Sequence, residues 1–239
     1  MITDIITHSY PKSPISEAYR VLRTNLKFTS FDSSLKTIVI TSSGPSEGKS
    51  TTVTNLAVTF VQSGSKAIII DADLRKPRIH KIFGISNRFG TTNSIVEPQA
   101  VDDYLQKTSI EGLDILTSGP LPPNPSELLG SKKMKDLLEL VKSRYDIVFI
   151  DSPPVGVVTD AQILSTLADG TILVAASGQV TFEALKRSKE LLGKVNANIL
   201  GVVVNMLEKE SSGYYYYYYR SDEDTGGISK KRKRRSWRR

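Results

Sequence analysis

Short runs of β-branched and other apolar residues recur along the chain, and a segment with helical spacing of its apolar positions follows each of the first four. Uninterrupted apolar runs of this length are typical of strands that are buried on both faces. The strands predicted on this basis cover residues 35–41, 66–71, 146–151, 171–176 and 200–205.

Alternation of strands and helices indicates how these elements pack. Parallel strands need crossover helices, which cover the sheet on each side. We therefore predict an α/β fold with a doubly wound, mainly parallel sheet and helices on both faces. The predicted crossover helices cover residues 51–62, 134–141, 161–167 and 182–195, and the proline-rich stretch 119–125 is predicted to be a loop.

The two ends of the chain differ from this pattern. Before the first strand, residues 16–27 are predicted to form a helix, with Ser16 as a candidate N-cap. Residues 211–239 contain six consecutive tyrosines, an acidic cluster and a basic block, a low-complexity composition that predicts a flexible tail. The expected organisation is an N-terminal helical segment (1–34), one α/β domain (35–210) and this tail (211–239).

Composition fits a soluble globular protein, since 39% of the 239 residues are hydrophobic and 24% are charged. The chain has no cysteine, which excludes disulfides and thiolate metal sites and suits a reducing cytoplasm. No apolar run approaches the roughly 18 residues that span a bilayer. Membrane contact is therefore expected to be peripheral.

The net charge of +7 is concentrated at one end of the chain. Residues 211–239 contain nine basic and three acidic side chains, a net charge of +6, which leaves +1 for residues 1–210. The globular part is close to neutral, so we expect no specific nucleic-acid-binding face on it.

The first predicted strand leads into a candidate phosphate-binding loop, and a predicted helix follows it, as this motif requires. Backbone N–H groups there can surround phosphates, Lys49 can reach the β and γ oxygens, and the Ser50 hydroxyl can bind Mg²⁺. Ser43 replaces the first glycine of the general pattern. The predicted nucleotide-binding residues are Gly44, Pro45, Ser46, Glu47, Gly48, Lys49, Ser50 and Thr51.

Three aspartates follow apolar strands and complete the candidate site. Asp151 ends one strand, whereas Asp71 and Asp73 lie at the end of another, where ligands of doubly wound folds bind. Asp151 is predicted to hold Mg²⁺ through water. Asp71 and Asp73 are two residues apart, so in an extended segment both can face the metal or an incoming hydroxyl. The predicted catalytic residues are Lys49, Asp71, Asp73 and Asp151, and the predicted metal-binding residues are Ser50, Asp71 and Asp151.

These motifs together resemble those of the bacterial tyrosine kinases that regulate capsular and extracellular polysaccharide synthesis, in the split form found in Gram-positive bacteria. The resemblance covers nearly the whole chain. Besides the phosphate-binding loop and the tyrosine run, the matching segments are Glu17-Ala18-Tyr19-Arg20-Val21-Leu22-Arg23, Asp71-Ala72-Asp73-Leu74-Arg75-Lys76-Pro77, Pro122-Pro123-Asn124-Pro125-Ser126-Glu127-Leu128-Leu129 and Asp151-Ser152-Pro153-Pro154.

The resemblance implies a protein-tyrosine kinase that uses ATP, produces ADP and requires Mg²⁺. The phosphate-binding loop, the Asp71 and Asp73 segment and Asp151 would be the Walker A, A′ and B motifs. Asp73 is expected to orient or deprotonate the acceptor hydroxyl, with Asp71 nearer the metal, although the sequence leaves this division open. The implied autophosphorylation sites are Tyr214, Tyr215, Tyr216, Tyr217, Tyr218 and Tyr219.

The resemblance also implies partners. A separate transmembrane activator would hold the cytoplasmic chain at the inner face of the plasma membrane, and a cognate tyrosine phosphatase would oppose it. Glu17, Arg20 and Arg23 lie on one helical stripe, which the family uses between subunits, so we expect a ring-like homo-oligomer. A solvated helix face with a local ion pair is the alternative.

The basic segment after the A′ acids has no single interpretation. Arg75, Lys76 and Arg78 could steer an anionic peptide, serve the subunit interface, or be plain surface charges.

Two rival functions remain. One is a partition or septum-positioning ATPase, but such proteins carry a signature lysine five residues before the P-loop lysine, where this chain has Gly44. The other is a nucleic-acid-binding protein, which rests only on the basic residues 230–239 and has low specificity.

Overall fold

The computed structural model describes residues 5–29 and 35–207. The strands are β1 (Thr37–Ser42), β2 (Ala67–Asp71), β3 (Gln106–Lys107), β4 (Leu113–Leu116), β5 (Ile147–Asp151), β6 (Gly170–Ala176) and β7 (Ile199–Asn205). The α-helices are α1 (Ile6–Ser9), α2 (Pro14–Thr29), α3 (Lys49–Val61), α4 (Ile79–Phe83), α5 (Thr91–Val96), α6 (Val101–Tyr104), α7 (Pro125–Leu129), α8 (Lys132–Lys142), α9 (Asp160–Leu167) and α10 (Phe182–Gly193), with a 3₁₀ turn at Pro98–Ala100.

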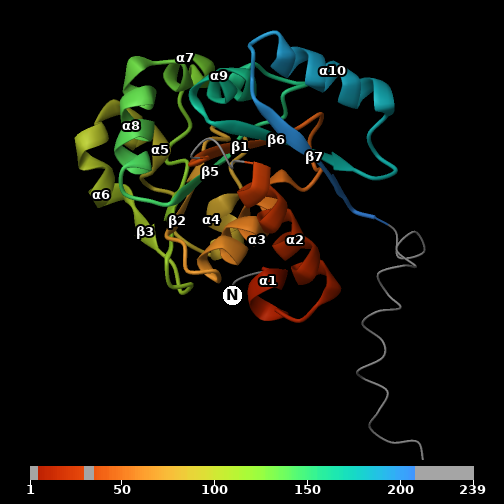
Figure 1. Cartoon of the computed structure of the whole chain (residues 1–239). Helices are drawn as coiled ribbons and strands as arrows, with labels where there is room; N and C mark the ends of the chain where they lie inside the picture. The colour runs from red at the N-terminus through yellow and green to blue at the C-terminus, as the bar shows by residue number, and fades with distance from the viewer. Residues whose placement is uncertain (1–4, 30–34, 208–239) are drawn as a thin grey trace, which may run out of the picture. The chain divides into compact units, whose positions relative to one another are not determined.

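Within the described residues, the strands form one sheet in the order β3-β4-β2-β5-β1-β6-β7 (Figure 1). Every neighbouring pair is parallel except β3 and β4, which are antiparallel. The strand order reverses at β1: the chain runs from β1 to β2 through α3 on one face, and from β5 to β6 through α9 on the other. The doubly wound, mainly parallel α/β fold predicted from the sequence is confirmed.

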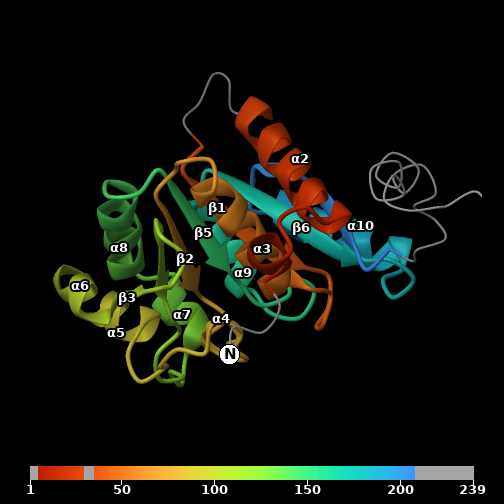
Figure 2. The same ribbon diagram turned by 90° about the horizontal axis from the view of Figure 1, so that it is seen from below.

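Among the described residues, three apolar clusters fill the space between the sheet and its helices, and the smallest lies between β6, α9 and α10. Ile38 and Ile40 of β1 belong to the cluster shared with α2 to α4, whereas Val39 belongs to the cluster shared with α5 to α9. Figures 1 and 2 show these helices on the two faces of the sheet. Since successive strand residues alternate between faces, a buried run without polar residues is what a sheet covered on both sides requires.

The predicted N-cap of the first long helix is wrong. Ser16 lies inside α2, fully buried, and its hydroxyl donates to the carbonyl groups of Ile6 and Tyr10 at 3.2 and 2.7 Å. The hydroxyl of Ser13 accepts a hydrogen bond from the Ser16 N–H at 3.1 Å, as an N-cap side chain does. The helix begins two residues earlier than predicted because Pro14 is favourable in a first turn.

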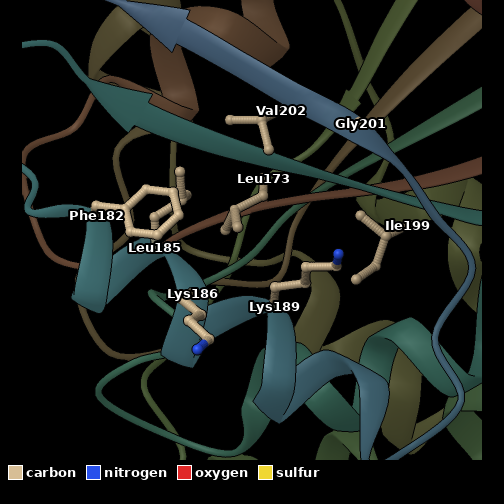
Figure 3. A pocket seen from close by; sticks show the side chains of 8 residues that line it. All are labelled: Leu173, Phe182, Leu185, Lys186, Lys189, Ile199, Gly201 and Val202. Atoms are coloured by element: carbon tan, nitrogen blue, oxygen red, sulfur yellow. The ribbon is translucent and has the colours of Figure 1, made fainter.

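The edge strand β7 is more exposed than the other parallel strands. Val202 and Val204 are 47% and 53% exposed, because β7 has a hydrogen-bonded neighbour only on the β6 side. Between β7 and α10 lies a groove with a volume of about 630 Å³ (Figure 3). It is lined by Leu173, Phe182, Leu185, Lys186, Lys189, Ile199, Gly201 and Val202, none of which is a predicted site residue.

Across residues 5–29 and 35–207, no helix is both long enough and apolar enough to cross a membrane.

Candidate functional site

The candidate phosphate-binding loop connects β1 to α3 at the carboxyl edge of the sheet. Gly48 has φ +89°, a conformation that L side chains rarely adopt. A Cβ atom added there would lie 2.0 Å from Nδ2 of Asn205, at the end of β7. The backbone conformation therefore favours glycine at this position, and any larger residue would also displace the Asn205 side chain.

The rest of the loop is held by short polar contacts. The backbone N–H of Gly44 donates to the Glu47 carboxylate, and the hydroxyl of Ser42 donates to the Gly44 carbonyl at 2.6 Å. Pro45 and Ser46 are exposed, and Ser46 has φ +63°. The backbone of the loop is thus fixed from inside, while its outer residues remain accessible.

Three further predicted nucleotide-binding residues open α3. Lys49 is 8% exposed, Ser50 is half-buried and Thr51 is exposed. Because the first N–H groups of a helix have no partner within it, this end of α3 favours a bound phosphate.

Asp151 lies at the centre of the site. It ends β5 and is opposite Asp71 of β2 on one side and Ile40 of β1 on the other. Its Oδ2 accepts a hydrogen bond from the Ser50 hydroxyl at 2.6 Å. Its Oδ1 is buried and has no hydrogen-bond partner among the described residues. Such an orphaned oxygen, next to a serine hydroxyl, fits a hard cation such as Mg²⁺.

The carboxylates of Asp71 and Asp73 accept hydrogen bonds from the backbone of the loop that follows β2. Asp71 accepts hydrogen bonds from the N–H groups of Asp73 and Ile79, at 3.3 and 3.2 Å. Asp73 Oδ1 accepts from the N–H groups of Arg75 and Lys76, at 3.3 and 2.9 Å. The segment after β2 is therefore not an extended strand but a loop that both carboxylates organise.

Electrostatics show how close these acids are to one another. Burial holds the pKa of Asp71 well above its usual range, and the negative charges of Asp151 and Asp73 add to this effect. Burial also raises the pKa of Asp151 to about 7, although the hydrogen bond from Ser50 and the charge of Lys49 oppose the change. A cation bound here would favour the ionised form of both groups.

The structure thus brings together Lys49, Ser50, Asp71, Asp73 and Asp151, the catalytic and metal-binding residues predicted from the sequence. Within the described ranges, no group of three or more His, Cys, Asp or Glu side chains forms a ready metal cage. Mg²⁺ is usually bound by one or two carboxylates together with substrate phosphates and water, so a cage of that kind is not required.

The other predicted functional residues lie elsewhere. Arg20 pairs with Glu17 at 2.8 Å, and Arg23 donates to the carbonyl of Thr59 at 2.6 Å, so this stripe of α2 is held within one chain. The predicted phosphorylation sites, residues 214–219, lie outside the described residues, as does the basic block at 230–239.

Asn205 is a residue of the site that the sequence did not single out. Its Nδ2 donates to the carbonyl of Glu47 at 3.0 Å and so ties β7 to the phosphate-binding loop. Its place at the end of the last predicted strand was the available signal, since the carboxyl ends of parallel strands share one edge.

Comparison with known proteins agrees with this geometry. The family model described as "ParA: NUBPL iron-transfer P-loop NTPase" matches residues 34–225. The chain is 45% identical over 205 residues to the tyrosine-protein kinase YwqD of Bacillus subtilis (strain 168), covering 86% of each chain. It is 38% identical over 213 residues to the putative tyrosine-protein kinase CapB of Staphylococcus aureus, covering 88% of this chain and 93% of that one.

Solved structures give the same result. The chimerical protein CapA2B2 superposes with a TM-score of 0.82 at 44% identity, covering 86% of this chain and 90% of that one. The kinase domain of the Escherichia coli tyrosine kinase ETK has a TM-score of 0.84 at 33% identity, with coverage of 87% and 82%. The septum site-determining protein MinD of Pyrococcus horikoshii is only 22% identical, with a TM-score of 0.60 and coverage of 71% and 69%.

The fold and the phosphate-binding loop define a P-loop NTPase of the ParA class. Within that class, the chain belongs to the family of bacterial tyrosine kinases, as the identity and coverage of its relatives show. The septum-positioning proteins share the fold alone.

Proposed function

We propose that this protein transfers the γ-phosphoryl group of ATP to tyrosine hydroxyls and that its own tyrosines 214–219 are acceptors. The observation that carries the proposal is the convergence of Lys49, Ser50 and three aspartates at one sheet edge, in a chain whose relatives are named tyrosine-protein kinases. We further propose that the activity regulates capsular or extracellular polysaccharide synthesis, because CapB and a Klebsiella pneumoniae relative described as lying in a cps region are similar over most of this chain.

Phosphoryl transfer depends on positioning and charge neutralisation rather than on covalent steps by the protein. In this proposal, the loop N–H groups and Lys49 hold the phosphates of ATP. Ser50 and Asp151 hold Mg²⁺, with Asp71 beside Asp151. When bound, Mg²⁺ would neutralise charge on the β- and γ-phosphate oxygens.

Asp73 is the residue that we assign to the acceptor. It is 7% exposed and lies beyond the strand end, in the loop between β2 and α4. Its carboxylate would orient the tyrosine hydroxyl and accept its proton as the hydroxyl oxygen bonds to the γ-phosphorus. The bond from that phosphorus to the β–γ bridging oxygen of ATP breaks, and ADP leaves with the electron pair. Asp71 is completely buried, which favours a place beside the metal rather than at the acceptor.

The proposal includes partners. Subunits would associate through Glu17, Arg20 and Arg23 into a ring-like homo-oligomer, so that a tail could reach a neighbouring site. A separate transmembrane activator would place the chain at the cytoplasmic face of the membrane, and a tyrosine phosphatase would reverse the modification. The similarity to a protein described as chimerical, CapA2B2, supports a second component that acts with a chain of this kind.

One experiment tests the catalytic proposal. Purified protein is incubated with Mg-ATP, with and without the cytoplasmic segment of a candidate activator, and phosphotyrosine is mapped by mass spectrometry. We expect modification within residues 214–219, increased by the activator. ATP hydrolysis without phosphotyrosine under both conditions would instead favour a nucleotide switch of the partition or septum-positioning type.

A further inference from the structure

Arg75 follows the A′ acids by two residues, and its side chain is engaged by a different, buried acid. The Arg75 Nε donates to Oδ2 of Asp160 at 2.9 Å, and its Nη2 donates to Oδ1 of the same carboxylate at 3.0 Å. A bidentate pair of this kind fixes the distance and the orientation of both groups. The Arg75 side chain is 38% exposed, whereas that of Asp160 is completely buried.

Ser126 completes the network. Its hydroxyl donates to Oδ1 of Asp160 at 2.6 Å and accepts a hydrogen bond from Nη2 of Arg75 at 3.0 Å. Ser126 belongs to α7, and Asp160 is the first residue of α9. These three side chains, which we call the Arg75 clasp, therefore tie the loop after β2 to two helices.

The clasp holds the loop firmly because its acid is buried. Without Arg75, Asp160 would keep a hydroxyl partner but lose its counter-charge, and an uncompensated buried charge strongly disfavours the folded arrangement. A lysine would not replace the guanidinium, since it cannot supply two parallel N–H donors to one carboxylate. The pairing with Asp160 therefore fixes the position of the Arg75 side chain and of the backbone at this residue.

That backbone is in direct contact with Asp73. The N–H groups of Arg75 and Lys76 both donate to Oδ1 of Asp73, at 3.3 and 2.9 Å. The position of Arg75 therefore decides where these two donors lie, and the donors decide the direction of the Asp73 carboxylate.

The clasp also bears on two of the other roles considered for Arg75, steering of an anionic peptide and a plain surface charge. Its positive charge is already paired with Asp160, so an anionic peptide would meet a neutralised cation. A plain surface charge would not be held by two acceptor side chains from two helices. Both alternatives leave this geometry unexplained.

We infer that Arg75 is a positioning residue for phosphoryl transfer: the clasp holds Asp73 in the direction in which it meets the acceptor hydroxyl. This inference rests on the role proposed above for Asp73.

The test compares the wild type with Arg75→Ala, with Asp73→Asn and with the control Lys81→Ala. Lys81 is an exposed cation on α4, and the side-chain partners of Asp160 among the described residues are Arg75 and Ser126. Phosphotyrosine formation is measured against ATP concentration in the full chain with activator. We expect kcat of Arg75→Ala to fall about 10- to 100-fold, as misplacement of a catalytic group does, while KM for ATP and ADP affinity stay at wild-type values.

A chemical rescue separates positioning from general stability. Added ethylguanidinium should restore part of kcat in Arg75→Ala, because the cation can occupy the space beside Asp160, and should leave Lys81→Ala and Asp73→Asn unchanged. Wild-type kcat in Arg75→Ala, a parallel loss of ADP binding, or no rescue would each overturn the inference.

Two outcomes distinguish a failure of the inference about Arg75 from a failure of the role proposed for Asp73. If Asp73→Asn keeps wild-type kcat, the proposed role of Asp73 fails, and the role of the clasp fails with it. If Asp73→Asn loses activity but Arg75→Ala does not, only the clasp is rejected. Should Arg75→Ala fail to fold, Ser126→Ala takes its place: it should lower kcat several-fold at unchanged KM, and an unchanged kcat would reject the inference.

Discussion

Lys49 is a buried cation at the start of α3. Its charge acts on the site, where it opposes the rise in the pKa of Asp151. We expect Lys49→Met to lower phosphotyrosine formation at least about 100-fold, the effect of removing one donor to transition-state charge, while leaving the fold intact. Immunoblotting measures the loss of phosphotyrosine, and thermal unfolding shows whether the fold is intact.

Asp73→Asn provides the comparison for this variant. It should also lose phosphorylation but retain more nucleotide affinity, since Asp73 is assigned to the acceptor and Lys49 to the phosphates. A Lys49→Met protein that is unfolded, or that phosphorylates as well as the wild type, would contradict the assignment.

The Asp169 side chain is expected to make the stability of the fold depend on pH in the acid range. Burial alone would raise the pKa of Asp169, but hydrogen bonds from Lys142, Lys36 and Thr37 lower it overall. An acid whose pKa is depressed in the folded state stabilises the fold above its unfolded pKa, and this contribution is lost as the pH falls through the folded value. We therefore expect stability to decrease below the usual aspartate range, near pH 4 and lower.

Asp169→Ala tests this expectation by denaturant unfolding at pH 7 and pH 3. The substitution leaves the N–H groups of Lys36 and Thr37 without their carboxylate acceptor. It should reduce the free energy of unfolding by about 1 to 3 kcal/mol at pH 7 and by less at pH 3. An equal loss at both pH values would show that the carboxylate does not act through its charge.

At the scale of elements, α2 carries the predicted subunit contact. Arg20 and Glu17 are both partly exposed, at 29% and 36%, and single exposed pairs contribute only about 0 to 1 kcal/mol. Single substitutions should therefore change little. Replacing Glu17, Arg20 and Arg23 together by alanine should lower the native mass measured by light scattering.

The matched control for this triple variant is alanine at Lys132, Lys135 and Glu139. These exposed residues belong to α8, which lies over the other face of the sheet. Their replacement removes two positive charges and one negative charge, as in the α2 variant. Equal native masses for the two triple variants would favour the alternative, in which the α2 stripe is a solvated helix face.

The long buried strands could be predicted from the sequence because uninterrupted apolar runs indicate their burial. The strand β4 was missed because Asp114 interrupts its run. That aspartate is buried in a strand only because the Tyr145 hydroxyl and Lys107 reach it, at 2.6 and 2.7 Å. Such partners come from other elements, so no local pattern indicates them.

At the scale of the whole molecule, some contacts of the site follow from the sequence pattern, whereas others depend on partners that lie far away in the sequence. Parallel topology places the ends of β1, β2 and β5 side by side, so the convergence of Ser50, Asp71 and Asp151 followed from the sequence pattern. The contact of Asn205 with the phosphate-binding loop and the pairing of Arg75 with Asp160 did not. Both join segments that are 85 or more residues apart and depend on side-chain directions.

Charge distribution gives a prediction for the chain as a whole. Residues 211–239, whose net charge is +6, contain all six predicted phosphorylation sites. Each phosphotyrosine adds about −1.5 to −2 at pH 7, so three or four would cancel this charge and six would bring it to about −3 or below. The unmodified segment should be attracted to anionic surfaces, and the modified segment should be repelled.

Co-sedimentation with anionic vesicles tests this reversal. Near such a surface each basic residue contributes about 1 kcal/mol, an attraction that salt screens. Unphosphorylated protein should therefore sediment at low salt, and binding should weaken at high salt, after autophosphorylation and on deletion of residues 230–239. Neutral vesicles control for apolar adsorption, for instance through the exposed side chains of β7. Equal binding before and after phosphorylation, or binding that survives the deletion, would mean that the charge of the tail does not control membrane attachment.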